Sequence, residues 1–322
     1  MMKRVLVTGA GGQIGADLVR CLRREAVVVA TDLTGPTYLN VTQKEQVRRV
    51  MAEHQPDTVI HLAAMLSAKG EGDVARTLEV NNLGTQHILE AAIDCGAVEK
   101  VFLPSSIAVY GGGSSLLSAA PETASCRPTT IYGVTKLYNE LLGEYYHQRH
   151  GLDVRILRLP GVISALAPPG GGTTDWAVDM YKAAAVKKEK APYRCFLAPT
   201  TTMPMLYVDD LLRGVRSFLD ADASALKRRT YNLGGFSFSP EDLAAHLNID
   251  VDYAPDFRQA IADSWPRRLN DDAAREDWGW QPQFDDLHTM TQSILPRLTA
   301  DLSNNNNNND ENIHGPNIRI HV

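Results

Sequence analysis

Three polar side chains near the middle of the sequence have the types and spacing needed for proton transfer from an alcohol. Tyr132 and Lys136 stand four residues apart in "IYGVTK", so on a helix they share one face. An ammonium beside a phenol favours the phenolate, which lowers a tyrosine pKa from its usual value of about 10. Ser106 ends the strand-like run "KVFLPSS". Such a pair alone often means two surface side chains, but with Ser106 it predicts general acid–base chemistry.

A glycine-rich stretch near the N-terminus predicts a nucleotide-binding loop. "TGAGGQIG" (8–15) places Gly9, Gly12 and Gly15 between a strand-like run and a helix-like run. Glycines there permit a tight turn and let a pyrophosphate approach the N–H groups of a helix N-terminus. Asp32 ends the second strand-like run, where a carboxylate accepts hydrogen bonds from the adenosine ribose hydroxyls and repels a 2′-phosphate. We therefore expect NAD rather than NADP, against the alternative of an ordinary glycine turn.

The elements that would position these residues alternate between strand and helix. Continuous apolar runs, as in buried parallel strands, are followed by helix-like stretches near 13–24, 43–54, 72–95 and 130–149. This order predicts an α/β fold with a doubly wound parallel Rossmann sheet, in which ligands bind at the carboxyl ends of the strands. The expected strands are 4–9, 26–32, 58–64, 100–106 and 154–163.

The pattern becomes less regular after about residue 165. A strand is expected at 231–235, a capped helix at 239–247 and a helix near 285–301. We expect an NAD-binding Rossmann domain at 1–164, to which 206–236 returns, and a smaller, mainly substrate-binding region at 165–302. The asparagine-rich run that follows predicts a disordered tail at 303–322.

Composition excludes several classes of protein. The chain has 322 residues and a net charge of −6, without the basic surface that nucleic acid or an anionic membrane would need. No apolar run is long enough to span a bilayer. The four cysteines lie far apart, which favours reduced thiols, and no spaced cluster of ligands predicts a metal site. A strand-like run starting near residue 4 leaves no room for a presequence, so we expect a cytoplasmic protein, or a mitochondrial matrix protein if a presequence has been removed.

Together, "TGAGGQIG", "HLAA", "NNLGT", "LPSSIAVYG" and "YGVTK" resemble the extended short-chain dehydrogenase/reductase superfamily over residues 3–163. The resemblance implies that Ser106 orients the substrate hydroxyl, Tyr132 is the acid/base, and Lys136 holds the nicotinamide ribose. It also implies a homodimer formed through long helices near 80–95 and 130–149. One departure is Asn40, where relatives often carry an aspartate near the adenine. The implied cofactor-binding residues are Gly9, Gly12, Gln13, Ile14, Gly15, Asp32, Asn40, Val41, Leu62, Ala63, Ala64, Asn81, Tyr132, Lys136 and Val162.

Longer motifs resemble one branch of that superfamily, the short-chain-type L-threonine 3-dehydrogenases. They are "RLPGVIS…PPGGGTTDWAVDMYKAA", "CFLAPTTTMPMLYVDD" and "ADSWPRRLNDDAAREDWGW". The resemblance implies oxidation of L-threonine to 2-amino-3-oxobutyrate with NAD. Nucleotide-sugar enzymes typically carry an asparagine near Gly161. A nucleotide-sugar epimerase or dehydratase and a non-catalytic NAD-sensing protein remain the alternatives. The implied substrate-binding residues are Ser67, Ser106, Tyr132, Thr173, Thr174 and Asp175.

The segment "PPGGGTTDWAVDM" (168–180) supports two interpretations. As a binding site, its glycines and helix N-terminus would hold a carboxylate, the hydroxyls of Thr173 and Thr174 would donate, and Asp175 would pair with an ammonium. Alternatively, Thr174 only caps a helix and Asp175 interacts with its dipole. Elsewhere, we expect His61 and the tryptophans 265, 278 and 280 to be core residues, although Trp265 could cover the site. "KKEK" (187–190) is expected to be a solvated face.

Overall fold

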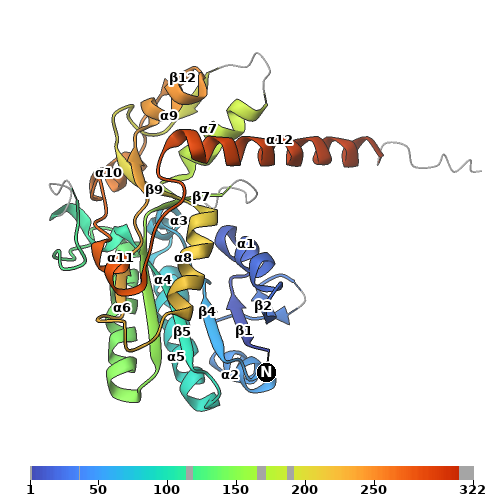
Figure 1. Cartoon of the computed structure of the whole chain (residues 1–322), viewed down its shortest axis with the longest axis vertical. Helices are drawn as coiled ribbons and strands as arrows, with labels where there is room; N and C mark the ends of the chain where they lie inside the picture. The colour runs from blue at the N-terminus through green and yellow to red at the C-terminus, as the bar shows by residue number, and fades with distance from the viewer. Residues whose placement is uncertain (1, 36, 114–118, 165–171, 187–191, 312–322) are drawn as a thin grey trace, which may run out of the picture.

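The structure is a computed structural model that describes residues 2–35, 37–113, 119–164, 172–186 and 192–311, with side chains to residue 300 (Figure 1). The expected solvated face at 187–190 and the first glycines of the 168–180 segment lie outside the described residues.

A seven-stranded, wholly parallel sheet forms the centre of the larger part of the molecule. Its order, β10-β6-β5-β4-β1-β2-β3, confirms the predicted doubly wound α/β fold. From β1 the chain runs outward to β3 and then crosses back to β4, so the strand order reverses between β1 and β4, where such sheets bind ligands. The strands are β1 (Arg4–Thr8), β2 (Val27–Asp32), β3 (Thr37–Tyr38), β4 (Thr58–His61), β5 (Lys100–Ser106), β6 (Asp153–Leu159) and β10 (Thr230–Asn232).

Helices cover both faces of this sheet because the strands are apolar on both sides (Figure 1). One face packs against α1 (Gln13–Leu22), α8 (Val208–Asp220) and α11 (Asp272–Trp278). The opposite face packs against α2 (Lys44–His54), α5 (Gly84–Cys95) and α6 (Ile131–His150).

The expected helix at 72–95 is largely confirmed, because the chain is helical without a break from residue 74 to residue 95, with one π-helical turn inside and a separate short helix before it. The segments are α3 (Ser67–Gly72), α4 (Val74–Leu78), the π-helical turn η1 (Glu79–Leu83) and α5. Asp73 separates the first two, where its side chain accepts a hydrogen bond from the Arg76 N–H and so begins a new helix. Two short 3₁₀ turns, η2 (Ile107–Val109) and η3 (Gly111–Gly113), follow β5.

The expected strand at 154–163 is also divided. Pro160 lacks an N–H and ends β6, after which β7 (Gly161–Ile163) joins a different sheet. That sheet has the order β11-β9-β7, with β9 (Met203–Tyr207) and β11 (Phe236–Phe238), and a further pair joins β12 (Val251–Tyr253) to β8 (Tyr193–Cys195).

A second hydrophobic core lies under these small sheets. It includes Trp176, Tyr181, Met205 and Phe238, and it packs with α7 (Asp175–Ala185), α9 (Pro240–Leu247), α10 (Arg258–Asp263) and α12 (Leu287–Glu311). Ser239 forms the capping box that starts α9, as its sequence predicts. The domain boundaries at 164 and 302 stay predictions.

The predicted disordered tail at 303–322 overlaps the end of a helix. Helix α12 continues through residues 303–311, although asparagine is a weak helix former. Residues 312–322 lie outside the described part of the chain. All four cysteines are free, and no helix in the described ranges is long and apolar enough to cross a membrane.

Candidate active site

The glycine loop lies against the ends of β1 and β4, where close backbone approach requires glycine. Gly9 has φ +66°, and a Cβ there would come within 2.7 Å of the Ala63 nitrogen. A Cβ at Gly15 would lie 2.2 Å from the Gly9 oxygen. Among the described residues, no side chain caps α1 and no acid occupies its first turn, so its first N–H groups are available to an anion. The loop therefore fits a pyrophosphate.

Asp32 closes the loop from the neighbouring strand. Its Oδ2 accepts a hydrogen bond from the Gly11 N–H at 2.8 Å, and its Oδ1 accepts one from the Leu33 N–H at 2.7 Å. The carboxylate is thus held at the carboxyl end of β2, beside the glycine loop. This placement suits a bond to the adenosine ribose, which stays a prediction.

Three other expected cofactor-binding residues do not line the cavity and make contacts within the protein instead. The Asn40 Oδ1 accepts hydrogen bonds from both the N–H and the hydroxyl of Thr42, so this oxygen stabilises the local backbone. Val41 is buried beneath α5, at Gly84. Asn81, in η1, accepts a hydrogen bond from the Met65 N–H at 2.7 Å and donates one to the Met65 oxygen at 3.1 Å. It therefore anchors the loop after β4.

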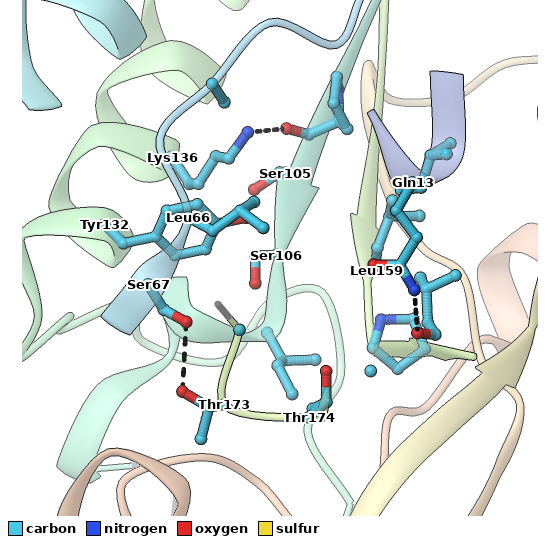
Figure 2. A pocket seen from close by; sticks show the side chains of 18 of the residues that line it. Gln13, Leu66, Ser67, Ser105, Ser106, Tyr132, Lys136, Leu159, Thr173 and Thr174 are labelled. Carbon is cyan, nitrogen blue, oxygen red and sulfur yellow. Dashed lines mark hydrogen bonds between the residues drawn. The ribbon is translucent and has the colours of Figure 1, made fainter. Parts of the chain in front are cut away.

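Tyr132 and Lys136 project from the first two turns of α6 toward the end of β5 (Figure 2). The helix starts there because the Thr130 hydroxyl accepts the Gly133 N–H at 3.1 Å. The Lys136 Nζ donates to the Pro104 oxygen at 2.8 Å and lies 5.4 Å from the centre of the Tyr132 ring. Ser106 bonds to Tyr132 and lies between it and the open cavity. The three expected catalytic side chains are thus brought together.

Burial controls the acidity of this group. It raises the pKa of Tyr132 to about 12, and the bond to Ser106 opposes that change. It lowers the pKa of Lys136 to about 8, and the Glu140 carboxylate opposes that change. The expectation that Lys136 brings the tyrosine pKa below 10 is therefore not met, because the loss of solvent around the Tyr132 hydroxyl outweighs its hydrogen bond with Ser106.

The start of α7 forms the opposite wall. The Thr173 Oγ1 lies 3.2 Å from the Ser67 Oγ, and both side chains are buried (Figure 2). Thr174 occupies the N-cap position, yet among the described residues its hydroxyl makes no capping bond. Instead, the Asp175 Oδ2 accepts the Gly172 N–H at 2.9 Å. The interpretation of Thr174 as a helix cap is therefore wrong for its side chain.

A cavity of about 220 Å³ joins these parts. All six expected substrate residues line it, whereas Asp32, Asn40, Val41, Ala63 and Asn81 do not. The expected cofactor residues that line it are Gly9, Gly12, Gln13, Ile14, Gly15, Leu62, Ala64, Tyr132, Lys136 and Val162.

Sequence reasoning did not assign the apolar wall. Leu66 and Ile107 line the cavity, and their only sequence signal is that they follow strand ends. Trp265 is buried against Ile107, yet it borders the cavity and its Nε1 has no hydrogen-bond partner among the described residues. Both expectations for Trp265, a core residue and a cover for the site, therefore fit its position. Of the other tryptophans, Trp280 is buried and 278 is only partly buried.

His61 is a packed core residue, as expected. Its Nδ1 lies 2.7 Å from the Thr8 Oγ1, and burial lowers its pKa to about 3. Among the described residues, no three His, Cys, Asp or Glu side chains are clustered so that they could hold a metal ion.

Comparison with known proteins identifies the family. The model of the NAD-dependent epimerase/dehydratase family matches residues 5–234, and the chain belongs to this family, whose cofactor is NAD. L-threonine 3-dehydrogenase, mitochondrial, from Bos taurus is 40% identical over 302 residues, which cover 88% of this chain and 79% of the relative.

Solved structures give the same relationship. The crystal structure of L-threonine dehydrogenase from Phytophthora infestans is 41% identical, with a TM-score of 0.87 over 93% of this chain and 100% of that one. A monomeric L-threonine 3-dehydrogenase from a metagenome is 39% identical, with a TM-score of 0.86 over 92% and 99% of the two chains.

Proposed function

We propose that this protein is an NAD-dependent L-threonine 3-dehydrogenase, which oxidises the β-hydroxyl of threonine to give 2-amino-3-oxobutyrate. The observation that carries the proposal is the shared cavity. Ser106, Tyr132 and Lys136 lie on one side of it, and the polar start of α7 lies on the other. A small amino acid with a hydroxyl group matches both sides.

Each catalytic side chain has a distinct role. Ser106 orients the substrate hydroxyl, Tyr132 takes its proton as general base, and Lys136 holds the nicotinamide ribose. When bound, NAD⁺ accepts the hydride from Cβ and carries a positive charge that favours the phenolate. Tyr132 and Lys136 would therefore work beside the positively charged nicotinamide ring, which favours the phenolate form of Tyr132.

Several groups of the chain would hold the cofactor. The α1 N-terminus and the glycine loop would bind the pyrophosphate, and Asp32 would accept hydrogen bonds from the adenosine ribose. Gln13, whose amide donates to the Val162 oxygen at 3.4 Å, would lie beside the nicotinamide half. The assignments of Asn40 and Val41 to the adenine side remain part of this proposal.

The substrate's charged groups would lie against α7. A substrate carboxylate could accept hydrogen bonds from the first N–H groups of α7, from the hydroxyls of Ser67 and Thr173, and from the Trp265 Nε1–H. Asp175, which is 7% exposed, is the nearby acid for the ammonium. The Thr174 hydroxyl borders the same space.

Gly161 favours the dehydrogenase over the epimerase alternative. A Cβ there would lie 2.4 Å from the Met205 Sδ and 2.7 Å from the Thr174 Cγ2. An asparagine of the kind that nucleotide-sugar enzymes carry near this position would therefore displace Thr174. The site gives that space to the α7 wall instead.

A homodimer is part of the proposal. Val134, Tyr138, Leu141 and Tyr145 repeat at helical spacing along α6, and all four are exposed, Leu141 by 65%. Leu83, at the junction with α5, is exposed as well. Exposed apolar side chains at helical spacing on α6 suit a self-complementary interface. Sedimentation of the wild type and of Leu141→Glu tests this, since a monomeric wild type contradicts it.

We place the protein in the cytoplasm, or in the mitochondrial matrix if a presequence has been removed. The mitochondrial name of the bovine relative supports the second compartment.

The decisive experiment is a substrate screen. NADH formation is followed with L-threonine, L-allo-threonine, L-serine and simple alcohols, with NAD and with NADP in parallel. UDP-glucose is tested for epimerisation. Threonine-dependent NADH formation supports the proposal, and epimerisation without it favours the alternative. NAD binding without any turnover would favour an NAD-sensing protein.

A further inference from the structure

A buried ion pair lies directly behind the catalytic side chains. Glu140 follows Lys136 by four residues on α6, and Arg158 reaches it from β6. The Arg158 Nε donates to the Glu140 Oε1 at 2.9 Å, and its Nη2 donates to Oε2 at 2.7 Å. Only 5% and 7% of the two side chains are exposed. Such a two-pronged contact fixes both the distance and the orientation of the groups.

The pair reaches the catalytic strand through a serine. The Ser105 hydroxyl donates a short hydrogen bond to the Glu140 Oε1, and Ser105 immediately precedes Ser106 at the end of β5. Glu140 therefore connects the strand end that presents Ser106 to the helix that presents Tyr132 and Lys136.

On its other side, the pair reaches the loop that carries Trp265. The Arg158 Nη1 donates to the Tyr110 hydroxyl at 2.9 Å, which donates to the Asn232 Oδ1 at 2.7 Å. The Asn232 Nδ2 in turn donates to the Asn270 oxygen at 2.7 Å, five residues beyond Trp265. One hydrogen-bonded chain thus runs from α6 to Asn270, in the loop that also carries Trp265.

We propose that Glu140 and Arg158 are positioning residues of the active site, which hold Ser106, Tyr132 and Lys136 in register and set the pH range in which they work. The inference rests on the proposed function, because it takes Tyr132 and Lys136 as the catalytic pair.

The opposite charges of Glu140 and Arg158 balance each other beside Tyr132 and Lys136, so removing either charge should change the pH dependence of the enzyme. Near neutral pH the buried neighbours of Lys136 and Glu140 carry little charge, because burial lowers the pKa of His61 to about 3 and raises that of Tyr110 to about 12. Burial also raises the pKa of the Cys126 thiol. The Glu122 carboxylate faces Arg228, at 3.9 Å. Arg158 and Glu140 are thus opposing charges behind the catalytic pair, and removing one leaves the other uncompensated.

The two single variants should therefore shift the pH profile of kcat in opposite directions. Glu140→Gln leaves a cation, which lowers the pKa values of both Tyr132 and Lys136, so the profile moves to lower pH by about one unit. Arg158→Met leaves an anion and moves the profile to higher pH. The double variant removes both charges and returns the profile toward that of the wild type.

Arg155→Met is the matched control. Arg155 is also a buried arginine of β6, and it pairs with Asp153 at 2.7 Å, outside the catalytic cavity. Its loss should lower the melting temperature and leave the pH profile in place. Arg158→Lys keeps the charge, so its profile should stay at the wild-type position even if its stability falls.

The experiment measures kcat against pH for these variants, with Tyr132→Phe alongside. Opposite shifts that cancel in the double variant support the proposal. Equal losses of stability with unmoved profiles overturn it, provided that Tyr132→Phe is inactive. An active Tyr132→Phe enzyme would instead refute the general-base role given to Tyr132, whereas a wild type that forms no NADH with threonine would refute the proposed function.

Should the charge variants fail to fold, Ser105→Ala and Tyr110→Phe each remove one hydroxyl beside the pair. A fall in kcat of several-fold at an unchanged melting temperature supports the positioning role, and an unchanged kcat in both overturns it.

Discussion

The Ser67 Oγ lies 3.2 Å from the Thr173 Oγ1, although 106 residues separate them in the chain. Ser67 begins the first helix after β4, on the cofactor side, and Thr173 immediately precedes the N-cap of α7, in the smaller region. Their contact closes one side of the cavity, so a substrate held there must lie against residues from both parts of the molecule.

Tyr132→Phe should remove the proposed general base and keep the ring. Turnover of threonine should fall by roughly 10²–10⁴, the usual cost of losing such a group. NAD affinity, measured by calorimetry, should change little because the glycine loop is untouched. Near-normal turnover would show that another group takes the proton.

Asp32→Ser should weaken NAD and improve NADP relative to it. The serine removes both the acceptor for the ribose hydroxyls and the charge that repels a 2′-phosphate. The ratio of kcat/KM values for the two cofactors measures the effect. Equal use of both cofactors by the wild type would contradict the role given to Asp32.

Thr174→Val separates substrate binding from helix capping. Because the hydroxyl makes no capping bond among the described residues, the melting temperature should hold. In contrast, kcat/KM for threonine should fall about tenfold or more, as one lost bond to a charged group costs about 1.5–3 kcal/mol. Asp175→Asn should lower it similarly. Loss of stability with unchanged kcat/KM would mean that the substrate is held elsewhere.

Gly161→Ala should damage the α7 wall without touching a catalytic group. The new methyl would lie 2.7 Å from the Thr174 Cγ2, and such overpacking costs about 1–3 kcal/mol. We expect a lower melting temperature and a raised KM for threonine. Gly72→Ala is the control, since no described atom lies within 4 Å of a Cβ at that position. Equal behaviour of the two variants would argue against the crowding.

Lys136→Met should abolish activity yet stabilise the protein at pH 7. Burial lowers the lysine pKa from 10.5 in the unfolded chain to about 8, so between these values the unfolded state binds more protons and the stability of the wild type rises with pH. Below about pH 8 the full cost of the buried charge is present. The variant should therefore melt roughly 3–8 °C higher at pH 7, with a gap that narrows toward pH 10.5. A difference in melting temperature that stays constant from pH 7 to pH 10.5 would contradict the lowered pKa of Lys136.

The sequence predicts the parts of this site that depend on local patterns. Glycine spacing, the four-residue interval between Tyr132 and Lys136, and apolar strand runs each have one simple physical meaning, and the structure places these residues around one cavity. Pro160 is another local signal in the sequence. Its missing N–H divides an apparently continuous strand and sends β7 into the second sheet.

Features that depend on contacts between residues far apart in the sequence could not be predicted from local patterns. Glu140 and Arg158 look like ordinary charges on a helix and a strand, and only the crossing of α6 over β6 buries them together. Trp265 is similar, because a tryptophan that borders a cavity has the same local sequence as one in a core. The π-helical turn has no clear signal in the composition of residues 79–83 either, and its Asn81 bonds to Met65 across 16 residues of sequence.

That turn changes what a one-residue deletion would do between α4 and α5. A π-helical turn contains about one more residue than an α-helical turn, so η1 behaves as a one-residue insertion within a longer helix. Deleting one residue between 79 and 83 would restore a regular helix and leave α4 and α5 in nearly the same rotational phase, because the wider turn had already absorbed the extra residue. Helix α5 would then keep its apolar face toward the sheet, whereas the position of Asn81 opposite Met65 would change. A single-codon deletion here should therefore spare the fold and weaken the loop after β4 that Asn81 anchors.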